Sequence, residues 1–291
     1  MSFESLARLS MEAEASSVFD AVIDEDVRDR QVTREESFAS MRRLYAAMKA
    51  ADASYVPEER SASGLVGGDG ARFAQYAATK DTLCGDFMAE VITRALRMGE
   101  CNACMKRIVA APTAGSCGVL PAVLVPLQQR MGLADEEMVR ALFVAGGVGQ
   151  VIAHRAFIAG AAGGCQAEVG TAAAMAAAAL VYLRAGSAEA CMHAGAMALK
   201  NLMGLVCDPV AGLVEVPCVK RNVIGAACAL TSADMALAGI RSAIPPDEVI
   251  DAMREVGEKM DVSLRETGEG GVAATPFARA FSKEMTERGQ A

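Results

Sequence analysis

Apolar residues recur every three or four positions in two segments, one near each end of the chain. Thr33 and Glu36 have the spacing of a capping box, which opens a helix. The apolar positions that follow this pair are Phe38, Met41, Tyr45 and Met48. The second segment follows two prolines, and its apolar positions are Val249, Met253, Val256 and Met260. Such steps place each set on one helix face, so both segments are predicted to be amphipathic helices packed on a more apolar body.

Residues 61–245 are predicted to form that body, because they contain the most apolar segments of the chain. Two of these segments, 141–153 and 172–183, are shorter than the roughly 20 residues that a membrane span needs. We therefore expect buried core helices and no membrane segment. The first four residues show no basic stretch followed by an apolar run, so no signal peptide is expected.

The amino-acid composition predicts that this body is helical. Hydrophobic residues make up 53% of the 291 residues, but aromatic residues only 4%, and Trp is absent. Ala, Met and Leu, which favour helix, are abundant, while strand formers such as Ile and Tyr are scarce. The prediction is an all-α protein, a compact bundle of Ala-, Gly- and Met-rich helices with Gly/Pro loops. Because no long linker appears, we expect 1–291 to be a single helical domain, with 1–60 as an amphipathic helical N-terminal segment.

The charge balance excludes two classes of partner. Twenty-eight Lys and Arg against 36 Asp and Glu give a net charge of −8. Proteins that bind nucleic acid or anionic membranes generally present a basic face, so neither partner is expected.

A glycine-rich break at 112–118 precedes a predicted helix that begins at Val119. Free backbone N–H groups at a helix start attract anions such as a carboxylate, which makes Thr113 and Ser116 candidates for substrate contact. An ordinary helix-start turn is the alternative. The segment has neither Gly-Lys-Ser/Thr nor G-x-G-x-x-G, so nucleotide binding is not favoured.

The nine cysteines, an odd count, do not resemble a secreted disulfide framework and suit a reducing cytoplasm. Cys101 and Cys104 form a C-x-x-C pair, but a helical stripe through Cys101 and Met105 favours simple packing, and six of the nine are expected to pack. The other three lie beside Gly or Pro in irregular backbone: Cys165, Cys207 and Cys218. Three such thiolates could hold an iron–sulfur cluster with one iron left open as a Lewis acid. Packing is again the alternative.

Several motifs, taken together, resemble the α chain of iron–sulfur-dependent L-serine dehydratase, over about residues 2–280. In chain order they are Ser63-Gly64-Leu65-Val66-Gly67-Gly68-Asp69, Ala111-Pro112-Thr113-Ala114-Gly115-Ser116-Cys117-Gly118, Gly164-Cys165-Gln166-Ala167-Glu168-Val169-Gly170, Cys207-Asp208-Pro209-Val210-Ala211-Gly212, Val216-Pro217-Cys218-Val219-Lys220-Arg221-Asn222 and Arg265-Glu266-Thr267-Gly268-Glu269-Gly270-Gly271-Val272-Ala273. Ala114 departs from the Asn that many relatives have there.

The resemblance implies a helical catalytic domain with a [4Fe-4S] cluster held by Cys165, Cys207 and Cys218. It implies conversion of L-serine to pyruvate and ammonia without pyridoxal phosphate. Because this chain starts directly at the α region, a separate β chain is expected as partner, in an oligomer. Seven residues are expected to contact the substrate: Ser61, Ser63, Gly64, Thr113, Ser116, Arg221 and Asn222. For Arg221 and Asn222 the alternative is that they hold the cluster loop.

Three residues are candidates for the base that takes the Cα proton: Glu168, Lys200 and Asp208. Each also has a purely structural interpretation, as a helix charge, a surface cation and a turn residue before proline. The same fold could act on L-threonine or L-cysteine. A non-catalytic helical subunit with packed cysteines is a further alternative. A pyridoxal-phosphate lyase would need a Schiff-base Lys, and no phosphate-cradle motif in the sequence supports that interpretation.

Overall fold

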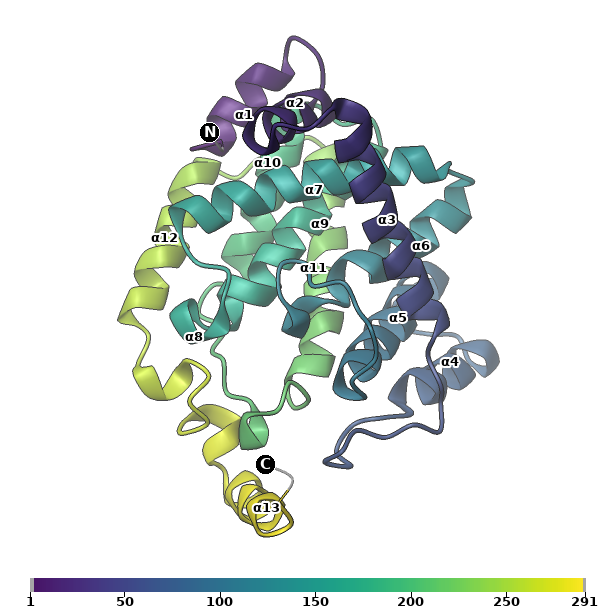
Figure 1. Cartoon of the computed structure of the whole chain (residues 1–291), viewed down its shortest axis with the longest axis vertical. Coiled ribbons are helices and arrows are strands. Elements are labelled where there is room, and N and C mark those ends of the chain that lie inside the picture. Colours follow the sequence, from purple (N-terminus) through teal and green to yellow (C-terminus); the bar gives the residue numbers. More distant parts are fainter. Residues whose placement is uncertain (1–2, 290–291) are drawn as a thin grey trace.

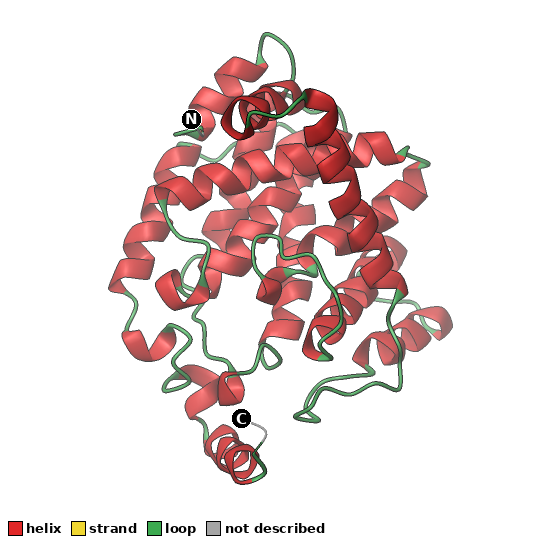
Figure 2. Ribbon diagram, in the orientation of Figure 1, coloured by secondary structure: helices red, strands yellow, loops and turns green. Residues whose placement is uncertain are grey.

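The central helices of the protein are built from the predicted apolar runs. The computed structural model describes residues 3–289. The first two and last two residues of the expected domain lie outside the described residues. The same holds for residues 1 and 2 of the N-terminal start that was considered for a signal peptide. Within that range no β-strand occurs, and the all-α prediction is confirmed (Figure 2). The α-helices are α1 (Leu6–Ala13), α2 (Val18–Arg30), α3 (Arg34–Ala53), α4 (Asp69–Thr79), α5 (Gly85–Ala103), α6 (Val119–Met131), α7 (Asp135–Arg155), α8 (Gly160–Gly163), α9 (Thr171–Leu183), α10 (Ala188–Asn201), α11 (Cys218–Leu237), α12 (Pro246–Lys259) and α13 (Pro276–Glu287). Short 3-10 or π-helical turns are η1 (Ala114–Ser116), η2 (Gln166–Gly170), η3 (Val210–Gly212), η4 (Val262–Leu264) and η5 (Gly271–Ala274).

Helix α9 lies at the centre and packs against α6, α7, α10 and α11 (Figure 1). Every residue from 171 to 181 is buried, and most of them are Ala. Small side chains let neighbouring helices approach closely, and burial of apolar surface stabilises the contact. The segment Gln166–Leu183, which joins η2 and α9, is long and apolar enough to cross a membrane by composition alone, but 83% of it is buried inside the protein. The burial predicted for 172–183 is thereby confirmed.

Two adjacent glycines of α7 offer a matched test of this close packing. A Cβ atom at Gly147 would lie 2.4 Å from Val22 Cγ2 of α2, whereas one at Gly146 would meet no heavy atom within 4 Å. We expect Gly147→Ala to lower the free energy of unfolding by about 1–3 kcal/mol, the usual cost of overpacking a core. Gly146→Ala should leave it unchanged or raise it by up to about 1 kcal/mol, because Ala is the better helix former. Chemical denaturation measures both, and equal losses would contradict the expectation.

The two predicted amphipathic helices are confirmed as α3 and α12. Glu36 N–H donates to Thr33 Oγ1 at 3.1 Å, and Thr33 N–H donates to Glu36 Oε2 at 2.8 Å, which completes the capping box at the start of α3. Tyr45 and Met48 are buried against the core, and so is Met253 on α12. Helix α3 packs on α7, and α12 packs on α10.

Two expectations about the remaining cysteines are wrong. Helix α5 ends at Ala103, so the stripe predicted through Met105 breaks there. Met105 has a φ of 59° and is 90% exposed, because the chain turns away from the helix axis. Cys84 is exposed rather than packed, because it lies in the turn that precedes α5. The other five are buried or partly buried as expected: Cys101, Cys104, Cys117, Cys191 and Cys228.

Candidate metal and active site

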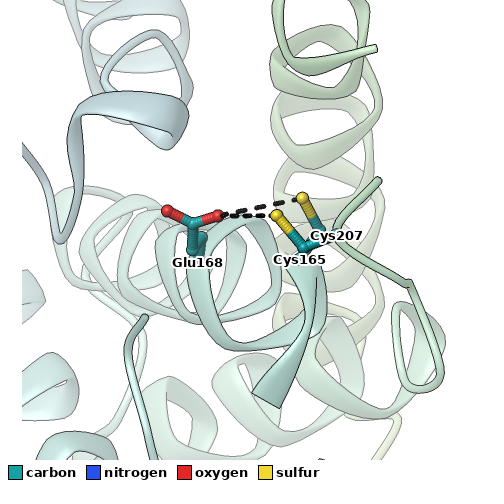
Figure 3. A group of neighbouring side chains, drawn as sticks. All are labelled: Cys165, Glu168 and Cys207. Carbon is teal, nitrogen blue, oxygen red and sulfur yellow. Dashed lines mark hydrogen bonds between the residues drawn. The ribbon is translucent and has the colours of Figure 1, made fainter. Parts of the chain in front are cut away.

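The buried thiols of Cys165 and Cys207 and the carboxylate of Glu168 form one group of potential metal ligands. Their ligand atoms all lie within 4.8 Å of one another. Glu168 Oε2 lies 3.8 Å from Cys165 Sγ and 3.9 Å from Cys207 Sγ (Figure 3). Cys165 and Glu168 come from the single turn at η2, while Cys207 comes from the loop after α10. Because thiolates and carboxylates both ligate metals, this group could hold a metal.

Two glycines leave room for this group. Gly164 has a φ of 77°, in the region that glycine adopts most readily, and it turns the chain from α8 into Cys165. A Cβ atom at Gly160 would lie 2.6 Å from Glu168 Oε2 and 2.7 Å from Cys207 Sγ. Any larger residue at position 160 would therefore fill the space beside both ligand atoms.

Cys207 is held by backbone pairing with the C-terminal segment. Cys207 N–H donates to Leu264 O at 2.8 Å, and Glu266 N–H donates to Cys207 O at 2.7 Å. The pairing forms an isolated parallel bridge between Cys207 and Arg265. The closing motif of the sequence thus fixes the backbone of one of the predicted cluster ligands.

Asp208 and Arg221 form an ion pair beside the thiols. Arg221 Nη2 donates to Asp208 Oδ1 at 2.8 Å, and Nη1 donates to Val206 O at 2.7 Å and to Cys165 Sγ at 3.4 Å. Val272 N–H donates to Asp208 Oδ2 at 2.7 Å, and Asp208 is only 2% exposed. Both carboxylate oxygens of Asp208 are engaged, so the pair ties the Cys207 loop to α11.

Electrostatic surroundings differ among the thiols. The hydrogen bond from Cys207 and the positive charge of Arg221 lower the pKa of Cys165, although burial opposes them. The same hydrogen bond, together with burial, raises the pKa of Cys207. Burial raises the pKa of Glu168 above its ordinary value. Cys165 is therefore the more readily ionised of the two paired thiols, and the thiolate is the form that ligates metals.

Cys218, the third predicted cluster ligand, begins α11 and is 8% exposed. Burial is the main cause that raises the pKa of its thiol to about 12, and the negative charges of Cys165 and Glu168 add to it. The sulfur of Cys218 lies outside the group of ligand atoms within 4.8 Å of one another. Arg221, three residues further along α11, donates to Cys165 Sγ at 3.4 Å, so the start of α11 lies close to Cys165.

The 113–118 loop lies on another side of Glu168. Thr113 Oγ1 donates to Glu168 Oε1 at 2.7 Å and lies 3.2 Å from Ser116 Oγ. The buried side chain of Asn222 accepts a hydrogen bond from Gly118 N–H at 2.9 Å and donates to a carbonyl of the same loop at 2.8 Å. The hydroxyl of Thr113 thus ties the loop to Glu168, and Asn222 ties the loop to α11.

Ser61 and Ser63, from the loop before α4, contact a residue that sequence reasoning missed. Ser61 Oγ donates to Glu215 Oε2 at 2.7 Å, and Ser63 Oγ donates to the same oxygen. Gly64 has a φ of 80°, and its N–H donates to Ser61 O at 2.9 Å, which closes the turn. Glu215 is an acidic residue flanked by two valines and lies three positions before Cys218. That setting was the available signal for a buried carboxylate.

Lys200 is the base candidate that the structure does not join to the others. It lies near the end of α10, and its Nζ donates to Ser242 Oγ at 3.2 Å. Across residues 3–289, no hydrogen bond or ion pair links Lys200 to the thiols or to Glu168. The network around the thiols instead includes the other two candidates, Glu168 and Asp208.

Several known proteins are similar to this chain in sequence. The family model described as "Serine dehydratase alpha chain" matches residues 13–273. "Probable L-serine dehydratase, alpha chain" of Bacillus subtilis (strain 168) is 47% identical over 268 residues, which are 92% of this chain and 89% of that protein. "L-serine dehydratase, alpha chain" of Peptoniphilus asaccharolyticus is 40% identical over 273 residues, 94% of each chain. "L-serine dehydratase 1" of Escherichia coli (strain K12) is 42% identical over 183 residues, which are 62% of this chain and 40% of that protein.

Proposed function

Because the chain belongs to the serine dehydratase alpha chain family, we propose that it is the catalytic subunit of an iron–sulfur-dependent L-serine dehydratase. The proposed reaction is the elimination of water from L-serine to give aminoacrylate, which tautomerises and hydrolyses to pyruvate and ammonia. The observation that carries the proposal is the group formed by the buried cysteines Cys165 and Cys207 and the half-buried Glu168, whose ligand atoms lie within 4.8 Å of one another.

The residues present fit an iron–sulfur cluster. Cys165, Cys207 and Cys218 supply three buried thiols, and thiolates are the usual protein ligands of such clusters. Gly160 keeps the space beside Cys207 Sγ free of side chain. Arg221 donates an N–H to Cys165 Sγ, the kind of outer hydrogen bond that orients and tunes a metal ligand. We infer that the three cysteines hold a [4Fe-4S] cluster, and the proposed reaction needs no pyridoxal phosphate.

When bound, a cluster with three cysteine ligands would supply an open iron, a Lewis acid that favours loss of the serine hydroxyl. The chain's own residues must then orient the substrate and accept its Cα proton. Thr113 and Ser116 lie on the loop that contacts Glu168, and Gly64 closes the turn that begins at Ser61; we retain all three as proposed substrate contacts. Arg221 holds the loop that carries Cys207, and Asn222 holds the loop that carries Thr113 and Ser116.

Among the three base candidates, position favours Glu168. Its Oε2 faces the two thiols, and the hydrogen bond from Thr113 to Oε1 fixes the orientation of the carboxylate. Both oxygens of Asp208 are engaged by Arg221 and by a backbone N–H, and Lys200 is bonded elsewhere. We therefore propose that Glu168 accepts the Cα proton at Oε2.

A separate β chain is the proposed partner. The relatives from Bacillus subtilis and Peptoniphilus asaccharolyticus are named as alpha chains, which implies a second chain. The match covers 40% of the Escherichia coli enzyme, so that enzyme contains further sequence beyond the matched part. A β chain could supply the equivalent of that further sequence here. We also propose an oligomer located in the cytoplasm, and the nine free cysteines accord with a reducing compartment.

Anaerobic reconstitution with iron and sulfide tests the proposed function. We expect a brown chain with charge-transfer absorbance that forms pyruvate from L-serine, measured with and without the β partner. Parallel assays with L-threonine and L-cysteine establish which β-leaving group is preferred. A colourless chain without turnover would contradict the proposal and favour a non-catalytic helical subunit.

A further inference from the structure

We propose that Glu215, with the hydroxyl groups of Ser61 and Ser63, binds the α-ammonium group of the amino-acid substrate. The inference rests on the proposed function, because the substrate of that reaction supplies the cation. It also makes the expected role of Ser61 and Ser63 more specific, since the sequence predicted only that they contact the substrate.

Glu215 is a buried carboxylate that lacks a cationic partner within residues 3–289. It is 6% exposed, and its hydrogen bonds come from two neutral hydroxyls. The cations nearest in sequence, Lys220 and Arg221, pair instead with Asp69 and Asp208. Glu is rarely buried unless it is paired, because an unpaired charge is costly to remove from water. The site therefore calls for a cation that the described chain does not provide.

The hydrogen bonds around Glu215 indicate where the hydroxyl hydrogens of Ser61 and Ser63 are directed. Ser61 Oγ accepts a hydrogen bond from Val66 N–H at 3.3 Å, and Ser63 Oγ accepts one from Leu65 N–H at 3.0 Å. Each hydroxyl has a single hydrogen, and each is directed to Glu215 Oε2. Neither serine has a hydrogen left for a substrate carboxylate, but each oxygen keeps a lone pair.

An ammonium group is the complement of this arrangement. It presents three N–H donors and no acceptor, and three oxygen-bearing groups converge here. Ser61 Oγ and Ser63 Oγ lie 3.2 Å apart, and both contact the Glu215 carboxylate. A carboxylate in the same place would meet only acceptors and a buried negative charge, so the set selects the amino end of the substrate.

This group of acceptors adjoins the proposed active site. A Cβ atom at Gly115 would lie 3.4 Å from Glu168 Oε1 and 3.6 Å from Val214 Cγ1. Val214 directly precedes Glu215, so the proposed base and the Glu215 segment are neighbours across Gly115. An amino acid carries its ammonium group on the same carbon that loses the proton, so the two functions must lie close together.

Kinetics of Glu215→Gln test the proposal, because the change removes the charge and keeps the side-chain size. L-Glycerate, which is L-serine with a hydroxyl in place of the ammonium group, serves as a competitive inhibitor. In the reconstituted enzyme we expect the KM for L-serine to rise about 10- to 100-fold, the range for a hydrogen bond to a charged group. The inhibition constant of L-glycerate should stay unchanged. The matched control is Glu90→Gln, an exposed site on α5, which should change neither value.

The other outcomes are equally informative. Equal weakening of L-serine and L-glycerate would mean that Glu215 only supports the loop, and an unchanged KM would also overturn the inference. If Glu215→Gln fails to fold, Ser63→Ala keeps the charge and should raise the KM by about 2- to 10-fold without affecting L-glycerate. No rise there would overturn the inference as well. Absence of turnover by the wild-type enzyme defeats the proposed function, and this inference with it, whereas turnover with normal KM in both variants defeats this inference alone.

Discussion

Cys207→Ala is expected to abolish both the charge-transfer absorbance and pyruvate formation after anaerobic reconstitution. The change removes one of the two thiols in the group of ligand atoms within 4.8 Å of one another. Loss of a thiolate ligand leaves the metal group without an anchor on the loop after α10, and metal affinity depends on every ligand being present. Iron content per chain, the visible spectrum and pyruvate release measure the effect.

Cys191→Ala is the matched control for that experiment. Cys191 is also fully buried, but it lies in α10 and packs in the hydrophobic core. We expect this variant to keep its iron and its turnover and to lose only a little stability, because the cavity left by one sulfur is small. Full activity of Cys207→Ala would refute the assignment of Cys207 as a ligand.

Glu168→Gln is expected to lower kcat by about 10²- to 10⁴-fold, the usual contribution of a general base. Gln has the size of Glu and can still accept the hydrogen bond from Thr113, but it cannot take a proton. All three cysteines remain, so the absorbance and iron content should match those of the wild type. Steady-state kinetics at saturating L-serine, with the spectrum recorded on the same sample, separate a lost base from a lost cluster.

Two comparisons make the Glu168 result decisive. Glu258→Gln, at an exposed position on α12, controls for the substitution itself and should leave kcat unchanged. Lys200→Gln compares the candidates directly. A larger fall in Lys200→Gln than in Glu168→Gln, or a normal kcat in Glu168→Gln, would remove Glu168 from the role of base.

Much of the fold was predictable because its signals are local. The capping box of Thr33 and Glu36 needs only four consecutive residues, and its two hydrogen bonds form as predicted at α3. The Ala-rich run of α9 and the stripe of α12 follow from helical period and composition alone. Resemblance of the motifs to the serine dehydratase alpha chain is likewise confirmed by the family match over residues 13–273.

The site was predictable only in part, because its contacts join residues that are distant in sequence. Ser61 lies 154 positions before Glu215, and Thr113 lies 55 positions before Glu168. No spacing rule connects such pairs, so the carboxylate that engages Ser61 was missed. Hydrogen-bond partners are likewise chosen by tertiary packing, so the sequence left open whether Arg221 and Asn222 contact the substrate or hold a loop, and the structure shows loop contacts for both.

The backbone pairing of Cys207 with residues 264–266 also sets an order of events during translation. A nascent chain that has grown past Cys218 already contains all three predicted ligands, but the segment that orients Cys207 has not yet been made. Contacts can form only after both partners have left the ribosome. The backbone around Cys207 therefore reaches its final conformation only after nearly the whole polypeptide has been synthesised. A message truncated between these points would yield a product that contains all three predicted ligand cysteines but lacks the segment that pairs with Cys207.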